Sequence, residues 1–282
     1  MSVTDTKPNG NGYEEAPARG IVETLLDLLA GTGRVFLNFL ASLGRIVNFT
    51  ALAIGYSVRP PYYPRLIVRQ MIDIGYYSLP VVGLTAIFTG MVLALQSYTG
   101  FARFSAEGAV ATVVVLSMTR ELGPVLAALM VAGRMGASMA AEIGTMRVTE
   151  QIDALTTLST NPYKYLVMPR LLAGLLMLPC LVVVADIIGV FGGFLIGVNK
   201  LGFNPASYLK QTFTYLEARD VISGLTKAAV FGFVISLMGC YHGYHSRGGA
   251  QGVGAATINA VVSALVMILV FNYLITEIFF SR

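Results

Sequence analysis

The chain has 282 residues, of which 55% are hydrophobic and only 12% are charged. Soluble domains carry about 25% charged residues, and a water-soluble fold with this much apolar surface would aggregate. The formal net charge of +4 comes from basic residues scattered through loops and the N-terminal region, which is typical of contact with anionic lipid rather than with nucleic acid. We therefore expect one integral membrane domain with no nucleic-acid partner.

The N-terminal region is polar at first and then apolar. Residues 1–20 are rich in Pro, Gly and Asn, which predicts a disordered tail, and they lack the features of a signal peptide, so we expect this end in the cytoplasm. Residues 21–65 are apolar but interrupted by charges. Their longest charge-free piece, between Arg34 and Arg45, is too short to cross about 30 Å of hydrocarbon. We expect an amphipathic helical segment lying in the cytoplasmic interface.

Five long apolar segments follow, at about residues 74–95, 109–141, 165–198, 221–241 and 256–280. Each reaches the length that a spanning helix needs, and a helix satisfies its own backbone groups inside lipid. The region before the first segment is rich in Lys and Arg, whereas Arg103 is the one basic residue of the loop after it. This asymmetry places the N-terminus inside and, after five spans, the C-terminus outside.

Ionisable residues occur inside these predicted spans, where they are costly and usually face a cavity or each other. Arg120 and Glu121 are adjacent, so on a helix they point about 100° apart and each needs another partner. Lys227 in the fourth span is the candidate partner for Glu121. Such a group either lines a polar cavity or fixes the register of the helices, and the sequence leaves both open. Asp73 and Asp186 are expected to reach the interface or to hydrogen-bond locally.

Glycines recur at four-residue spacing in the third span, at Gly189, Gly193 and Gly197. Small residues at this spacing allow two helices to approach closely. The pattern predicts tight packing of helices, either inside one subunit or at a dimer interface.

The segment 142–155 is charged and lies between the second and third spans. If it is helical from Thr145 onward, Val148, Ile152 and Leu155 form an apolar stripe at positions i, i+4 and i+7. A short amphipathic helix of this kind suits docking into a groove on a partner protein. It equally suits a helix that rests on the membrane surface.

Three motifs occur in a fixed order along the chain. They read GMVLALQ at 90–96, RELGPVLAAL at 120–129 and ExGTMRVTEQIDAL at 142–155. Together they resemble the signature of the MlaE/YrbE family of ABC transporter permeases, and the resemblance extends from about residue 21 to the C-terminus. Residues 66–282 would then form the five-span permease domain, giving an all-α integral membrane fold with an N-terminal interfacial helix and a cytoplasmic coupling helix.

The resemblance implies a homodimeric permease subunit with no catalytic residues, metal or cofactor of its own. ATP and Mg²⁺ would be bound by a separate cytoplasmic ABC ATPase. The family also implies a periplasmic ring of MCE-domain proteins and, in some systems, a STAS-domain subunit. The implied function is the movement of phospholipids or similar hydrophobic molecules between the inner and outer membranes, with this chain in the bacterial inner membrane.

The resemblance also assigns roles to residues. The segment 142–155 would be the coupling helix that contacts the ATPase, through Glu142, Gly144, Thr145, Met146, Arg147, Val148, Glu150, Gln151, Ile152, Asp153 and Leu155. The lipid cavity and its intramembrane charges would involve Arg120, Glu121, Lys227, Asn272 and Gln96. Relatives often carry an Asp at the position of Asn272. Asn272 cannot neutralise Lys227, although it can accept a hydrogen bond.

Two other classes of function remain as alternatives. A stand-alone secondary transporter or channel would favour inverted repeats, which are not visible here, and a central polar site. An intramembrane enzyme would need a metal-ligand set or a Ser-His pair in the spans, whereas the two histidines, His242 and His245, are expected in a loop. The chain has no G-x-x-x-x-G-K-[ST] motif, so an ABC permease would take its energy from a partner.

Overall fold

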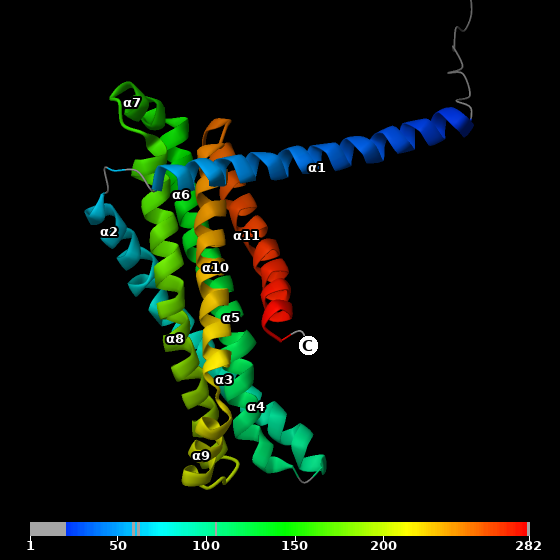
Figure 1. Ribbon diagram of the computed structural model, residues 1–282, viewed down its shortest axis with the longest axis vertical. Coiled ribbons are helices and arrows are strands. Elements are labelled where there is room, and N and C mark those ends of the chain that lie inside the picture. Colours follow the sequence, from blue (N-terminus) through cyan, green and yellow to red (C-terminus); the bar gives the residue numbers. More distant parts are fainter. Residues whose placement is uncertain (1–20, 58–59, 61–62, 105, 281–282) are drawn as a thin grey trace, which may run out of the picture. The chain divides into compact units, whose positions relative to one another are not determined.

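The computed structural model describes residues 21–57, 60, 63–104 and 106–280, and these form helices and turns with no β-strand among them (Figure 1). The predicted tail, residues 1–20, lies outside the described residues. The chain divides into two compact units, Met1–Asn48 and Phe49–Arg282, and the boundary falls inside helix α1 (Ile21–Ser57). The first unit is described by the N-terminal part of α1 alone.

Six helical stretches of the described chain are long and apolar enough to cross a membrane. Five of them correspond to the five predicted spans, each somewhat longer than the sequence indicated. They are Pro64–Phe101, Val110–Val148, Tyr163–Asn199, Ala218–Tyr244 and Gly249–Phe280. These helices confirm the expected all-α class of integral membrane protein.

The sixth stretch, Ala30–Tyr56, belongs to α1 and covers most of the segment that we expected in the membrane interface. Arg34 and Arg45 interrupt it, but it still meets the length and composition of a span. Its interfacial position therefore stays a prediction.

The described helices of the second unit follow α1 in the order α2 (Pro64–Ile74), α3 (Leu79–Phe101), α4 (Val110–Ser117), α5 (Gly123–Val131), α6 (Ala137–Val148), α7 (Gln151–Thr157), α8 (Met168–Asn199), α9 (Pro205–Tyr215), α10 (Ala218–Tyr244) and α11 (Gly249–Phe280). Single turns of 3₁₀ helix, η1 to η3, lie at Tyr76–Ser78, Ala102–Phe104 and Glu107–Ala109. Three π-helical turns, η4 to η6, lie at Met118–Leu122, Ala132–Gly136 and Tyr163–Val167.

The second predicted span is not one regular helix. It runs as α4, η4, α5, η5 and α6, so two π-helical turns interrupt it. Pro124, just after η4, explains part of this irregularity, because proline has no backbone N–H to donate to the carbonyl four residues earlier. π-helical turns inside helices are frequent at functional sites, and η4 carries both Arg120 and Glu121.

Glycines bring the backbones of α3, α8 and α10 into contact. A Cβ atom added at Gly90 would lie 1.8 Å from the carbonyl oxygen of Gly189, and one added at Gly232 would lie 2.1 Å from that of Gly174. No side chain fits at such a distance, so these positions require glycine. Gly193 and Gly197 face residues of the same chain as well, which confirms packing within one subunit as the role of this glycine pattern.

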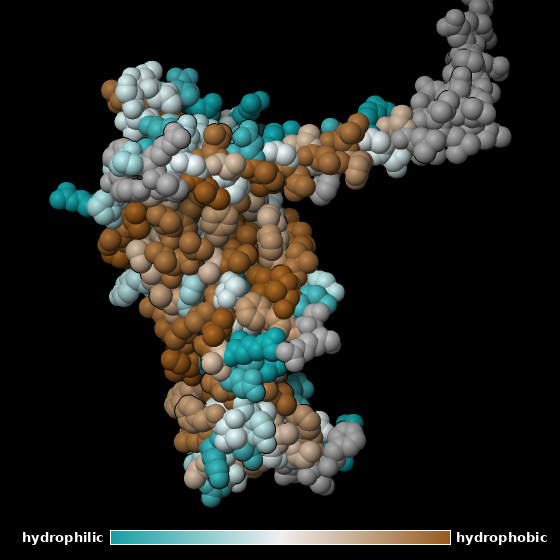
Figure 2. Space-filling view, viewed as in Figure 1, coloured by the Kyte–Doolittle hydropathy of each residue, from teal (hydrophilic) through white to brown (hydrophobic). Residues whose placement is uncertain are grey.

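The end of α1 that belongs to the second unit is held by aromatic contacts. The Phe49 ring centroid lies 5.3 Å from that of Tyr163 and 5.5 Å from that of Tyr241. Figure 2 shows hydrophobic side chains along the spans of the second unit, with hydrophilic ones gathered around α7 and again around α9. Aromatic residues at the border of such an apolar band are typical of a membrane interface.

Candidate functional site

A buried lysine joins the second span to the fourth. Lys227 on α10 is fully buried, and its Nζ donates to Glu121 Oε1 at 2.7 Å and to the Arg120 carbonyl oxygen at 2.9 Å. The Arg120 carbonyl is free to accept because Pro124, four residues later, has no N–H. The predicted partnership of Glu121 with Lys227 is confirmed.

Arg120 has its own partner on the same helix, α10. Its Nε donates to Asp220 Oδ1 at 2.8 Å, and Asp220 is buried. The other carboxylate oxygen of Asp220 accepts the Glu217 backbone N–H at 3.1 Å, which forms a capping box at the start of α10. The Arg120 guanidinium also lies 4.7 Å from the centroid of the Phe280 ring. Arg120 and Glu121 thus have separate partners, as predicted from their adjacent positions.

Helix α11 supplies the remaining hydrogen bonds to Glu121. Asn272 Nδ2 donates to Glu121 Oε2 at 3.0 Å, and the Thr276 hydroxyl lies 3.1 Å from Glu121 Oε1. Asn272 makes no hydrogen bond with Lys227 among the described residues: its Oδ1 is buried without a partner, and its amide group donates to Glu121. The amide suits this place, because an ionised carboxylate can only accept hydrogen bonds.

We call Arg120, Glu121, Asp220, Lys227, Asn272 and Thr276 the polar cluster. Its formal charges balance, with two basic and two acidic side chains. Lys227 and Asp220 are buried, whereas the Glu121 side chain is 39% exposed. The cluster therefore locks η4 to α10 and at the same time presents a carboxylate at the surface of the spans. Ionisable groups at this depth usually mark a functional site.

Two members of the polar cluster were missed in the sequence, and one predicted member lies apart. Asp220 had a signal in the Glu217-x-x-Asp220 spacing of a capping box, and Thr276 lies one turn after Asn272. Gln96 is exposed on α3, and no described hydrogen bond joins it to the polar cluster.

The segment predicted as a coupling helix is broken in two. Helix α6 ends at Val148, Glu150 has a left-handed φ of 59°, and α7 begins at Gln151. A continuous helix from Thr145 is therefore wrong, because a residue with positive φ cannot continue a right-handed helix. We call residues 142–158 the α6–α7 tip.

The turn also removes the predicted apolar stripe. Ile152 is buried inside the chain, Leu155 is half-buried and Val148 lies on the other helix. The large apolar side chain that the α6–α7 tip exposes most is Leu158, at 75%. A partner that docks here would meet Leu158 rather than Ile152.

The charges of this segment bind to the protein itself. Glu142 Oε2 pairs with Arg170 Nη2 at 2.7 Å, and the buried Arg170 also donates to the Leu166 carbonyl at 2.7 Å. Arg147 pairs with Asp153 at 2.7 Å across the turn. The first pair holds the segment against α8, and the second holds α7 against the end of α6, so Glu142, Arg147 and Asp153 are positioning residues.

The remaining predicted contact residues divide by exposure. Gly144 on α6 packs against the start of α11, because a Cβ atom added at Gly144 would lie 3.4 Å from the Val253 side chain. Met146 is half-buried. The exposed residues are Thr145, Glu150 and Gln151. These side chains are available to a partner, together with Val148, Leu158 and the exposed carboxylates of Glu142 and Asp153.

Glu142→Gln is expected to destabilise the protein by about 1–3 kcal/mol, because it leaves the buried Arg170 guanidinium without a charged partner. Thermal unfolding of the purified protein in detergent measures the change. Glu150→Gln, at an exposed position of the same segment, is the matched control. Equal unfolding temperatures for the two variants would contradict the positioning role of Glu142.

Asp186 does not reach an interface, contrary to expectation. It lies near the middle of α8, and its buried Oδ1 has no hydrogen-bond partner among the described residues. The carboxyl fits against Gly123, where an added Cβ would lie 1.8 Å from Oδ1. This contact joins two spans, and no pattern in the sequence predicts it.

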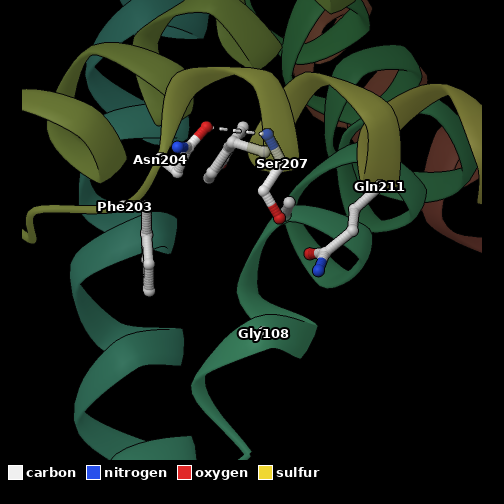
Figure 3. Close-up of a pocket in the computed structure, with 7 residues that line it drawn as sticks. Gly108, Phe203, Asn204, Ser207 and Gln211 are labelled. Atoms are coloured by element: carbon white, nitrogen blue, oxygen red, sulfur yellow. Dashed lines mark hydrogen bonds between the residues drawn. The ribbon is translucent and has the colours of Figure 1, made fainter.

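A small pocket lies beside the start of α9, between Gly108 and the residues Phe203, Asn204, Ser207 and Gln211 (Figure 3). Its volume is about 100 Å³, whereas pockets for small molecules hold about 300–1,000 Å³. Asn204 Oδ1 accepts the Ser207 backbone N–H at 3.2 Å and so caps α9. The polar groups here stabilise the helix start, and the pocket is too small for a lipid.

Comparison with known proteins assigns the chain to a family. The family described as Permease MlaE matches residues 67–278, which include the polar cluster and the α6–α7 tip. The chain belongs to the MlaE permease family. Both the sequence resemblance and the order of its motifs are thereby confirmed.

Named relatives of this MlaE-family chain are permeases. A probable ABC transporter permease protein of Rickettsia felis is 61% identical over 257 residues, 91% of this chain and 99% of the relative. One of Synechocystis is 40% identical over 89% of this chain and 88% of the relative. The intermembrane phospholipid transport system permease protein MlaE of Haemophilus influenzae is 34% identical over 91% and 99%. These names favour a permease subunit over a stand-alone transporter or an intramembrane enzyme.

Proposed function

We propose that this chain is the permease subunit of an ABC transporter that moves phospholipids, or similar hydrophobic molecules, between the inner and outer membranes of a bacterium. Membership of the MlaE family and the name of the Haemophilus relative support this function. The structural observation that carries it is the half-exposed Glu121 carboxylate, held at the depth of the spans by the buried Lys227. A charged headgroup entering from the membrane would find its polar contacts there.

The polar cluster supports a homodimer with the lipid site between the protomers. It lies where η4, α10 and α11 meet, and Arg120 and Glu121 remain partly exposed in one chain. Charges left against hydrocarbon are unfavourable, and a second copy over this face would enclose them in a cavity. The apolar side chains that α11 exposes, such as Val262 and Leu269, would line that cavity for acyl chains.

The energy would come from a cytoplasmic ABC ATPase that binds ATP and Mg²⁺ and docks on the α6–α7 tip. In this arrangement the N-terminus is cytoplasmic, as the distribution of Lys and Arg predicts. The ion pairs of Glu142 and Arg147 would transmit force from the docked ATPase into α8 and α6. A periplasmic ring of MCE-domain proteins and a STAS-domain subunit are further proposed partners that follow from the family resemblance.

Leu158→Asp tests the docking surface. Burial of a leucine side chain contributes about 1.5–3 kcal/mol, so loss of this contact is expected to weaken ATPase binding about tenfold or more. The measurements are co-purification of the ATPase and ATP-dependent transfer of a labelled phospholipid by the reconstituted complex. Ile152→Asp would be a poor test, because Ile152 is buried in the chain itself.

Tyr215→Asp, an exposed position on α9 far along the chain from the α6–α7 tip, is the control and should leave ATPase binding unchanged. Full ATPase binding by Leu158→Asp would reject the docking surface. Lipid transfer at full rate by the permease without any ATPase would reject the proposed function itself.

A further inference from the structure

An apolar groove outside the polar cluster has no role in the function proposed above. It runs between α8, α9 and the start of α10 and has a volume of about 490 Å³. Its walls include Ile187 and Phe191 on α8 and Leu209 and Phe213 on α9, all of them exposed. This volume falls within the range of about 300–1,000 Å³ that small-molecule sites occupy.

The length and the apolar lining of the groove suit a hydrocarbon chain. Its lining on α8 extends from Val183 to Phe194, which corresponds to about 16 Å at 1.5 Å per residue. An extended hydrocarbon chain is much narrower than a helix about 10 Å across, and an apolar groove of this length accommodates it.

Among the described lining residues, Asp186 is the one ionisable side chain with a carboxyl group. The hydroxyls of Thr119 and Thr212 are already used, because they donate to the carbonyls of Val115 and Tyr208 in their own helices. The Tyr208 hydroxyl, which also lines the groove, is buried without a described partner, but it can donate a hydrogen bond as well as accept one, whereas an ionised carboxylate can only accept. Asp186 takes part in none of the described ion pairs, and its Oδ1 has no hydrogen-bond partner there. Oδ1 itself is packed against Gly123, but no described hydrogen bond or ion pair satisfies either oxygen of this carboxyl group. A polar group without a partner in an apolar site is unfavourable, so the end of the groove at Asp186 is complementary to a hydrogen-bond donor.

We propose that this groove binds a hydrophobic amphiphile that carries one N–H or O–H donor, such as a long-chain amine or alcohol. The hydrocarbon chain lies along α8 and α9, and the donor bonds to the Asp186 carboxyl group. The site is separate from the polar cluster and does not depend on the transported molecule. It does share the turn η4 with it, because Thr119 in its wall lies two residues before Glu121.

Fluorescence quenching tests the proposal directly, because the chain has no tryptophan. Phe191→Trp places a reporter in the groove, and Phe88→Trp on α3 is the matched control, since the two phenylalanines are 52% and 57% exposed. The purified full chain in detergent is titrated with dibromostearylamine, dibromostearyl alcohol and methyl dibromostearate, whose ester has no donor. The amine and the alcohol are expected to quench Phe191→Trp at about tenfold lower concentration than the ester, and to show no such preference with Phe88→Trp.

Adding Asp186→Leu to the Phe191→Trp chain is expected to abolish the preference for the donor probes. In chains that keep Asp186, equal quenching by all three probes at Phe191→Trp would overturn the proposal. Equal preferences at the two reporter positions would overturn it as well. A preference that survives Asp186→Leu would overturn the role of the carboxyl group.

Discussion

Glu121→Leu is expected to destabilise the protein by about 3–5 kcal/mol, because it leaves the Lys227 ammonium fully buried with only the Arg120 carbonyl as a partner. Lys227→Met is expected to cost less, about 1–3 kcal/mol. In that variant Glu121 remains partly exposed and keeps the donors Asn272 and Thr276. The unfolding of each variant, measured against temperature or denaturant in detergent, gives the difference.

The double variant Glu121→Leu with Lys227→Met should be more stable than Glu121→Leu alone, because it no longer contains an unpaired buried charge. Glu277→Gln, an exposed acidic position on α11, is the control and should resemble the unmodified protein. If Lys227→Met destabilised the protein more than Glu121→Leu, the prediction that the buried Lys227 depends on Glu121 for its stability would be wrong.

Gly90→Ala is expected to prevent stable accumulation of the protein. Its Cβ would lie 1.8 Å from the Gly189 carbonyl oxygen, and neither backbone can move away without separating α3 from α8. Overpacking of a well-packed interior costs about 1–3 kcal/mol even where side chains can adjust, and here the contact is between backbones. The yield of folded monodisperse protein in detergent and its unfolding temperature measure the effect.

Gly100→Ala on the same helix is the matched control, because nothing lies within 4 Å of an added Cβ there. Alanine is favoured over glycine in a helix by about 0.5–1 kcal/mol, so this variant should be as stable as the unmodified protein or slightly more so. Similar yields for Gly90→Ala and Gly100→Ala would show that the α3–α8 contact is looser than described.

The spans were predictable because hydrophobic length is a strong signal and a helix is the economical structure in lipid. The partnership of Glu121 with Lys227 was predictable as well, since a buried charge needs a partner and few candidates exist in the spans. The family resemblance came from three motifs between residues 90 and 155, and these lie within the matched residues 67–278.

The features that were not predicted depend on local backbone geometry or on contacts between distant spans. The break at Glu150 was invisible, because a residue other than glycine in the left-handed region leaves no signal in the sequence. The contact of Asp186 with Gly123 depends on the packing of two distant spans, which periodicity within one span cannot show. The donor role of Asn272 depends on which carboxylate α11 approaches, and the sequence does not fix that position.

The backbone contacts through glycine distinguish α11 from the other long helices of the second unit. They join α3 to α8 through Gly90 and α8 to α10 through Gly232, whereas the described glycines of α11 make no such contact with another span. Sliding among these three spans would bring backbone atoms into collision, whereas a shift of α11 would disturb side-chain packing against α6 and α10 without a clash between backbones at glycine. Such a shift would withdraw Asn272 and Thr276 from Glu121 and leave its bond to Lys227 intact. The Glu121 carboxylate would then lose two neutral donors and accept hydrogen bonds from water in their place. The hydration of Glu121 would therefore report the position of α11 during transport.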